Sequence, residues 1–166
     1  MFFDRDGVLN TDFGYVHSPE KMRWTEGAVE AVKWCNDNGY LAIVITNQAG
    51  IARGYYSEEA FLALMDWMQE QLRQSGAHLD AVYHCPHHPT AGNGPLTRQC
   101  ECRKPAGGLV RQAIREWNID AVRSLLIGDK PSDIAAGEAC GVKGRLFTGG
   151  NLLAFMRQQV TVQRDR

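Results

Sequence analysis

The sequence of 166 residues lacks any apolar run approaching the roughly 20 residues of a membrane-spanning helix. It also lacks an appreciable net charge, because 18 basic and 19 acidic residues leave a formal charge of -1. A nucleic-acid-binding protein usually carries a strong basic excess, which is missing here. Charged residues at positions 4–6 interrupt the first apolar residues, so no secretory signal is visible. We therefore expect no membrane partner and no nucleic-acid partner.

The sequence also lacks the cysteine pattern of a disulfide-rich protein. Five cysteines is an odd number, and their clustering does not predict the paired framework of a secreted protein. A reducing cytoplasm is the expected location. No internal repeat, low-complexity linker or large apolar insertion is present, so residues 1–166 are expected to form one domain without a separate cap. Because no long exposed apolar repeat is present either, a monomer is expected.

Apolar runs typical of buried strands alternate along the chain with segments of helical periodicity. This alternation predicts an α/β fold, a Rossmann-like doubly wound parallel sheet with helices on both faces. In such sheets, ligands bind beyond the carboxyl ends of the strands. The predicted strands cover residues 1–3, 41–45, 81–83, 125–127 and 145–147, and the predicted helices begin near residues 28, 58, 109, 134 and 152.

Capping residues and apolar spacing predict where the helices begin and what they bury. Thr25 is a possible cap and Gly39 a stop for the first helix, and Ser57 caps the second. Cys35 and Cys140 fall in predicted helices and are expected in the core. The expected buried face of the second helix comprises Phe61, Leu64, Met65, Met68 and Leu72.

Two carboxylates one residue apart, Asp4 and Asp6, follow the first short apolar run. Asp4 is the expected nucleophile, because carboxylates can form aspartyl-phosphate intermediates. Asp6 would protonate the leaving oxygen and then deprotonate water for the second step. The alternative interpretation of this pair is a simple acidic turn.

Three further residues, at predicted strand ends and in a loop, complete a site for phosphoryl transfer. Thr46 would offer its hydroxyl and backbone N–H groups to phosphate, and Lys104 a point charge. Asp129 would add a carboxylate to a metal ion, and hard oxygen ligands together with a phosphate substrate favour Mg²⁺. Taken singly, Thr46 could simply end a strand and Asp129 could occupy a turn. Their occurrence together favours the phosphate site.

Four short motifs follow one another in the chain: Asp4-Arg5-Asp6-Gly7, Thr46-Asn47, Lys104-Pro105, and Gly128-Asp129 with Asp133. This order resembles that of the haloacid dehalogenase superfamily of phosphohydrolases. The resemblance implies a Rossmann-like core with the first motif on the central strand. It also implies that Mg²⁺ binds the Asp4 side chain, the Asp6 backbone carbonyl and the Asp129 side chain. Asp133 would then act indirectly, beyond these ligands.

A second metal site is predicted between residues 85 and 102. Cys85-Pro86-His87 and Cys100-Glu101-Cys102 read as C-x-H, a gap of 12 residues, and C-x-C. Three thiolates and an imidazole predict a closed tetrahedral Zn²⁺ site, which is structural and not catalytic. His84 and His88 are alternative nitrogen donors. Cys100 and Cys102 could also be free thiols, or one could form a disulfide with Cys85.

The predicted zinc loop ends close to the predicted phosphate site. Cys102 is two residues from Lys104, so zinc could fix the Arg103-Lys104 pair. We therefore expect zinc to influence catalysis indirectly, through this pair. Arg103 offers a guanidinium that can bind a phosphate through two hydrogen bonds.

The zinc loop narrows the resemblance to one branch of the superfamily, which holds heptose bisphosphate and histidinol-phosphate phosphatases. Residues 50–54 and the longer zinc loop favour a sugar bisphosphate, and histidinol phosphate is the alternative. Ala49 departs from the pattern, since that family often carries Ser there. By this resemblance, a small phosphorylated sugar would contact Asp12, Phe13, Gly14, Tyr15, Thr46, Asn47, Gln48, Ala49, Arg103, Lys104 and Lys130.

Overall fold

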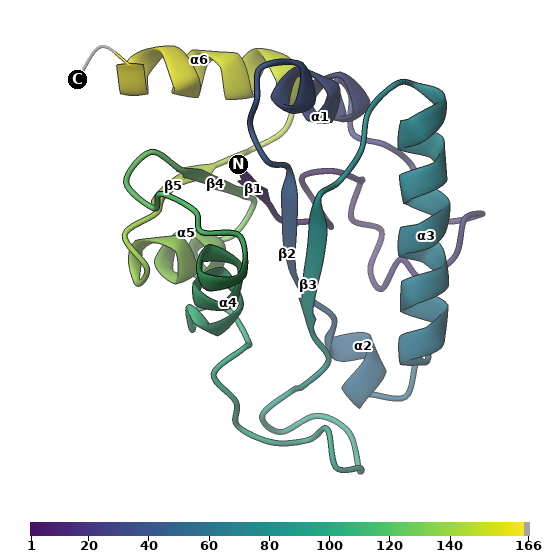
Figure 1. Cartoon of the computed structure of the whole chain (residues 1–166). Coiled ribbons are helices and arrows are strands. Elements are labelled where there is room, and N and C mark those ends of the chain that lie inside the picture. Colours follow the sequence, from purple (N-terminus) through teal and green to yellow (C-terminus); the bar gives the residue numbers. More distant parts are fainter. Residues whose placement is uncertain (165–166) are drawn as a thin grey trace.

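Five parallel strands form a sheet in the order β3-β2-β1-β4-β5 (Figure 1). The computed structural model describes residues 1–164. Because β1 lies between β2 and β4, the chain changes its direction of winding beside β1, and ligands bind at such switch points. The strands are β1 (Phe2–Phe3), β2 (Ile43–Asn47), β3 (Ala81–Cys85), β4 (Leu125–Gly128) and β5 (Lys143–Leu146). The parallel sheet confirms the predicted fold class.

Helices cover both faces of the sheet, as the alternating sequence predicts (Figure 1). One face packs against α1, α3 and α6, and the other against α4 and α5. The short helix α2 follows β2 directly. The bounds are α1 (Ala28–Asp37), α2 (Ala49–Ala52), α3 (Glu58–Gln74), α4 (Gly108–Glu116), α5 (Pro131–Glu138) and α6 (Leu152–Arg164).

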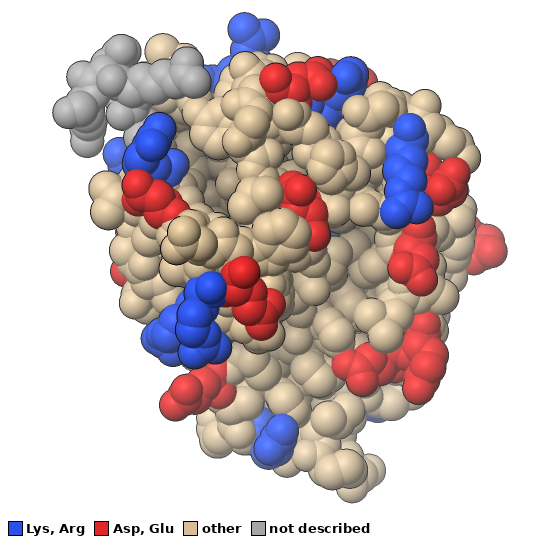
Figure 2. Space-filling view, in the orientation of Figure 1, with Lys and Arg blue, Asp and Glu red and all other residues tan. Residues whose placement is uncertain are grey.

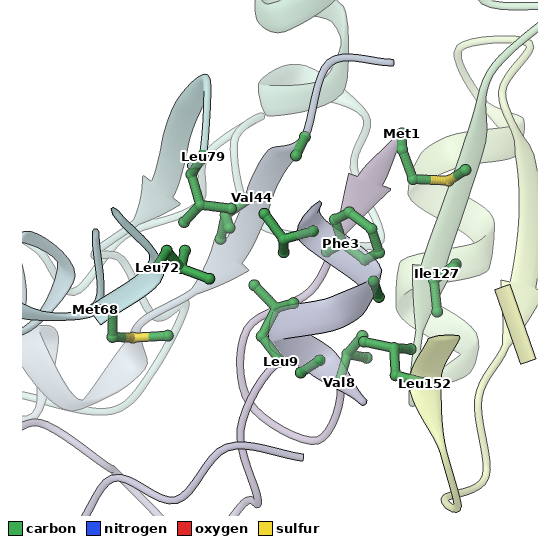
Figure 3. Packing of buried hydrophobic residues seen from close by; sticks show 14 of the residues in the cluster. Met1, Phe3, Val8, Leu9, Val44, Met68, Leu72, Leu79, Ile127 and Leu152 are labelled. Atoms are coloured by element: carbon green, nitrogen blue, oxygen red, sulfur yellow. The ribbon is translucent and has the colours of Figure 1, made fainter. Parts of the chain in front are cut away.

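The two residues of β1 point to opposite faces and anchor one core each. Phe3 packs in the cluster that contains Val44 of β2 and Leu72 of α3 (Figure 3). Phe2 packs in the other cluster, against residues of α4 such as Val110. Both phenylalanines are fully buried, and burying a side chain of this size contributes about 1.5–3 kcal/mol. The short strand is therefore held from both sides, which fixes the chain that follows it.

Helix α3 begins and packs as predicted. The Ser57 hydroxyl accepts a hydrogen bond from the Ala60 N–H, 3.1 Å away, and so caps the helix. Its buried face is the predicted one: Phe61, Leu64, Met65, Met68 and Leu72. Helix α6 buries Leu152 and Met156 in the same core, as its apolar spacing predicted.

Two predictions about helix ends were wrong. Thr25 does not cap α1; the cap residue is Gly27, with no side-chain hydrogen bond. The helix starts too late for the Thr25 hydroxyl to reach its first N–H groups, and only the Thr25 carbonyl is used, by Ala28. Cys140 lies beyond α5, because a turn at Gly141 ends that helix. It is half-buried against the second cluster, whereas Cys35 is buried in α1.

The loop after β3 extends from the carboxyl edge of the sheet, beside α2 (Figure 1). Strand β2 begins two residues later than predicted and β3 runs on to Cys85, so the first predicted zinc ligand ends a strand. Acidic and basic side chains are interspersed on the face shown in Figure 2, and no continuous basic patch covers this view of residues 1–164. Among those residues, no helix combines the length and apolarity needed to cross a bilayer. The single-domain and monomer assignments stay predictions.

Candidate active site

A cavity of about 580 Å³ opens at the carboxyl edge of the sheet. Asp4, which follows β1, and Asp6 both line it. The residues predicted to contact substrate line it too, except Phe13 and Thr46. Phe13 is 63% exposed, and Thr46 is 1% exposed. A second cavity of about 620 Å³ lies at the opposite edge and contains none of the predicted site residues.

Asp4 is buried and held by two donors. Its Oδ1 atom accepts the backbone N–H of Arg5 at 2.8 Å and lies 2.9 Å from Nζ of Lys104. Burial raises the pKa of the Asp4 carboxyl to about 7, although Lys104 opposes this rise. The site thus holds a carboxylate that is poorly solvated and oriented by a cation.

Lys104 is a buried cation at the centre of the site. Its Nζ atom lies 2.6 Å from Asp133 Oδ1 and donates to the Ile45 carbonyl at 2.8 Å. Burial alone would lower the pKa of Lys104, but Asp4 and Asp133 raise it by more, so that it is higher than usual. The ammonium therefore stays charged between two carboxylates.

Asn47 fixes the backbone of Lys104. Its amide nitrogen donates to the Lys104 carbonyl at 3.1 Å, and its amide oxygen accepts the Lys104 N–H at 3.0 Å. The end of β2 is thereby joined to the end of the zinc loop. Asn47 was predicted to contact substrate, and its amide supports Lys104 as well.

Three carboxylates are placed where a cation could bind. Oxygen atoms of Asp4, Asp129 and Asp133 lie within 4.8 Å of one another. Oδ1 of Asp129 is buried without a hydrogen-bond partner, and burial raises the pKa of this carboxyl. Such an unpaired oxygen fits a hard divalent cation such as Mg²⁺. Gly7 has φ 85, and a Cβ there would lie 2.4 Å from Asp129 Oδ2, so only glycine leaves room for this carboxylate.

Arg5, whose role sequence reasoning missed, is fully buried beside Asp6. Its Nη2 atom donates to both Asp6 carboxylate oxygens, at 2.8 and 2.9 Å. Its guanidinium carbon lies 5.5 Å from the centre of the Phe61 ring, within the range of a cation–π contact. A basic residue between two acidic ones was the signal for this ion pair. Asn10 adds a further hydrogen bond to Asp6, at 3.1 Å.

A lysine at the cavity rim, Lys130, lies between two aspartates. Nζ of Lys130 lies 3.6 Å from Asp12 and 3.8 Å from Asp129. These carboxylates offset the effect of burial and raise the pKa of Lys130. Tyr56 and Ser132 also line the cavity and were not predicted. Ser132 lies within the motif from Gly128 to Asp133, whereas no motif marked Tyr56.

The four predicted zinc ligands come together. The three sulfur atoms are 3.0 to 3.6 Å apart, and Nδ1 of His87 lies 3.2 Å from Cys102 Sγ and 3.6 Å from Cys85 Sγ. Tetrahedral Zn²⁺ with Zn–S bonds of about 2.3 Å would separate its sulfur ligands by about 3.8 Å. The donor set and spacing therefore fit zinc. The disulfide alternative is wrong, since all of these cysteines are free.

The zinc loop contacts the phosphate site through Arg103. Nη1 of Arg103 donates to the backbone carbonyl of His87 at 3.3 Å. A residue of the metal cluster thus holds a residue that lines the cavity. This contact is a physical route for the predicted indirect influence of zinc.

The sequence and fold match those of known proteins. The family model described as HAD-hydrolase-like matches residues 101–161. A D-glycero-beta-D-manno-heptose-1,7-bisphosphate 7-phosphatase of Pasteurella multocida is 47% identical over 147 residues, 89% of this chain and 79% of the relative. A D-glycero-alpha-D-manno-heptose-1,7-bisphosphate 7-phosphatase of Photorhabdus laumondii is 45% identical over 141 residues, 85% of this chain and 77% of the relative.

A solved structure supports the same assignment. The D,D-heptose 1,7-bisphosphate phosphatase from B. bronchiseptica, complexed with magnesium and phosphate, superimposes with a TM-score of 0.81. It is 29% identical, and the match covers 99% of this chain and 96% of that one. The parallel sheet and its edge of carboxylates therefore define a HAD-like phosphatase. Within that class, the chain belongs to the heptose-1,7-bisphosphate 7-phosphatase family.

Proposed function

We propose that this protein hydrolyses the 7-phosphate of D-glycero-D-manno-heptose 1,7-bisphosphate through an aspartyl-phosphate intermediate. The observation that carries the proposal is the convergence of Asp4, Lys104 and Asp129 in a chain of this family. The names of the relatives give no support to the histidinol-phosphate alternative. The enzyme class is that of a phosphoric monoester hydrolase.

The first chemical step would be attack of the Asp4 carboxylate on phosphorus. The bond between phosphorus and the ester oxygen breaks as the new bond between Asp4 and phosphorus forms. Asp6 would give a proton to the departing sugar oxygen, which leaves as an alcohol. Lys104, 2.9 Å from Asp4, would stabilise the negative charge on the transferring phosphoryl group.

The second step would return the enzyme to its starting state. Asp6, deprotonated by the first step, would take a proton from water, and the water oxygen would attack phosphorus. The bond between phosphorus and Asp4 then breaks and inorganic phosphate is released. Thr46 supports the site from the end of β2. Because its side chain is buried, its backbone N–H is the group that would bind phosphate most directly.

Two metals are proposed as cofactors. Mg²⁺ would be held by the Asp4 and Asp129 carboxylates and the Asp6 backbone carbonyl, with Asp133 beside them. When bound, it supplies positive charge that offsets repulsion between carboxylate and phosphate. Zn²⁺ would be held by Cys85, His87, Cys100 and Cys102 and would stabilise the loop. The named relative with bound magnesium and phosphate supports the first of these.

Substrate selection would rest on the residues around the cavity. Arg103 and Lys130 offer positive charge at its rim, and a bisphosphate presents a second anionic end. Asp12, Gly14 and Tyr15 form one wall. A small sugar phosphate would fit a cavity of about 580 Å³.

The test is a comparison of phosphate release from three substrates, namely the α and β anomers of the heptose bisphosphate and histidinol phosphate. We expect turnover of a heptose bisphosphate that requires Mg²⁺ and is abolished by Asp4→Asn. A preference for histidinol phosphate would overturn the substrate assignment. Activity near the wild-type level in Asp4→Asn would rule out Asp4 as the nucleophile. Running both anomers would also decide which of them the enzyme prefers.

A further inference from the structure

The Gln48 side chain is buried and all of its polar atoms are engaged within the protein. It is only 2% exposed. Its Nε2 atom donates to Asp6 Oδ2 at 3.1 Å and to Thr46 Oγ1 at 2.9 Å. Its Oε1 atom accepts the Tyr56 hydroxyl at 2.6 Å. The amide thus links the acid/base candidate Asp6 to the end of β2, with little capacity left for a substrate.

The Tyr56 hydroxyl and the Asp6 carboxylate together set which way the amide points. An amide that receives a hydrogen bond from Tyr56 through its oxygen must turn its nitrogen toward Asp6. If the amide reversed, its oxygen would face the Asp6 carboxylate, and two acceptors would be opposed. Burial raises the pKa of Tyr56 to about 12, so its hydroxyl remains a donor at neutral pH.

Packing fixes Tyr56 in this position. Its ring stacks on His17 with ring centres 4.8 Å apart and planes 7° from parallel. On another side, a Cβ on Gly50 would lie 2.1 Å from the Tyr56 ring, so the ring occupies space that only glycine leaves open. A side chain held this tightly suits an orienting role.

Gln48 completes the set of donors around the Asp6 carboxylate. Arg5 contacts both oxygens and Asn10 contacts Oδ1, and both of these donors belong to the same segment as Asp6. Of the hydrogen bonds that this carboxylate accepts from side chains within residues 1–164, only the one from Gln48 comes from a separate strand end. It therefore sets where the carboxylate lies relative to β2 and the cavity.

We propose that Gln48 and Tyr56 are positioning residues: Tyr56 orients the Gln48 amide, and the amide holds the Asp6 carboxylate where it transfers protons to and from the reacting oxygens. The inference rests on the proposed function and deepens it. It assigns to Gln48, which was expected to contact substrate, a role that acts through Asp6.

The test uses Tyr56→Phe, which removes the hydroxyl and little else. For a series of small phosphate monoesters, kcat/KM is plotted against the pKa of the leaving alcohol or phenol. Poor leaving groups need a proton from Asp6, whereas p-nitrophenolate leaves without one. We expect kcat/KM to fall about tenfold for alkyl esters and less than about twofold for p-nitrophenyl phosphate, since a general acid contributes about 10²–10⁴-fold and is here only misplaced.

The slope of that plot separates positioning from general disturbance. In Tyr56→Phe the dependence of kcat/KM on the leaving-group pKa should become steeper. It should approach the dependence seen in Asp6→Asn, which lacks the general acid altogether. An equal loss for every ester, or no loss, would overturn the inference. Small esters also lack the sugar, so a direct sugar contact by Tyr56 would not steepen the slope.

Controls keep the result interpretable. Tyr83→Phe removes a hydrogen-bonded hydroxyl outside the cavity, between Glu116 and Trp117, and should leave the slope unchanged. If Tyr56→Phe fails to fold, Gln48→Met, which keeps the side-chain length without the amide donors, must show the steeper slope. Wild-type activity in Asp4→Asn would overturn the proposed phosphatase mechanism itself, which is a different outcome.

Discussion

Nζ of Lys104 lies 2.9 Å from Oδ1 of Asp4, and both groups are buried. The ammonium comes from the end of the zinc loop, and the carboxylate follows the first strand. This ion pair joins two parts of the chain that are 100 residues apart in sequence. It holds the proposed nucleophile beside the charge that would stabilise the transferring phosphoryl group.

Replacing Lys104 tests this pair. Lys104→Met should lower kcat by about 10²–10³-fold, the usual cost of removing one donor that stabilises transition-state charge. It should also lower stability by about 3–5 kcal/mol, because the buried carboxylates of Asp4 and Asp133 would face each other without a cation. Steady-state kinetics and urea unfolding measure the two effects. Lys33→Met, which breaks an exposed pair with Asp37, is the control and should change stability by less than about 1 kcal/mol. Unchanged kcat in Lys104→Met would contradict the assignment.

The raised pKa of Asp4 predicts a pH dependence of stability without magnesium. Burial lifts this pKa from 3.8 to about 7 in the folded protein. The folded state then binds more protons than the unfolded state, so stability due to this group is present below pH 3.8 and is lost as the pH rises toward 7. As the pH rises from 3.8 to about 7, the free energy of unfolding of the wild type should fall relative to that of Asp4→Asn. Mg²⁺ should reduce this fall. Urea unfolding at pH 5 and pH 8, with and without Mg²⁺, measures it. Parallel pH curves for the two proteins would contradict the prediction.

Removing one cluster thiol tests the zinc loop. Cys100→Ala should bind less zinc, melt at a lower temperature and turn over more slowly, because the His87 carbonyl would no longer hold Arg103 in place. Metal analysis, thermal unfolding and kinetics report the three effects. Cys140→Ala, outside the cluster, should keep its zinc. Full activity and full thermal stability in Cys100→Ala would reject the indirect role of zinc.

Arg103 tests recognition of the second phosphate. Arg103→Ala should raise KM for the heptose bisphosphate by about 10–100-fold. This is the change expected from the loss of one charge-assisted hydrogen bond, which contributes about 1.5–3 kcal/mol. The KM for p-nitrophenyl phosphate, which has one phosphate, should change much less. Arg111→Ala, on α4 and exposed, is the matched control. An equal rise in KM for both substrates would place Arg103 at the reacting phosphate instead.

The fold class could be predicted from the sequence because parallel strands and their helices leave separate, periodic signals. The same reasoning placed Asp4 and Asp129 together, since residues at the carboxyl ends of parallel strands meet at one edge. Lys104 lies in a loop and was predicted from its motif and its charge. The cluster of Cys85, His87, Cys100 and Cys102 could be predicted from spacing, because three thiolates and an imidazole are the donor set of a closed zinc site. Helix ends were predicted less well. Thr25 was expected to cap α1, but Gly27 occupies the cap position.

Other parts of the site depend on contacts that no local pattern encodes. The sequence alone predicted which residues would carry phosphate chemistry and which would bind zinc, because charge, thiol spacing and strand ends are properties of short segments. Only the tertiary structure decided that Gln48 donates to Asp6, that Tyr56 donates to the Gln48 amide oxygen, and that Asn47 binds the backbone of Lys104. Those partners are 8 to 57 residues apart. Their contacts exist because folding brings the ends of the strands together and excludes water from the space between them.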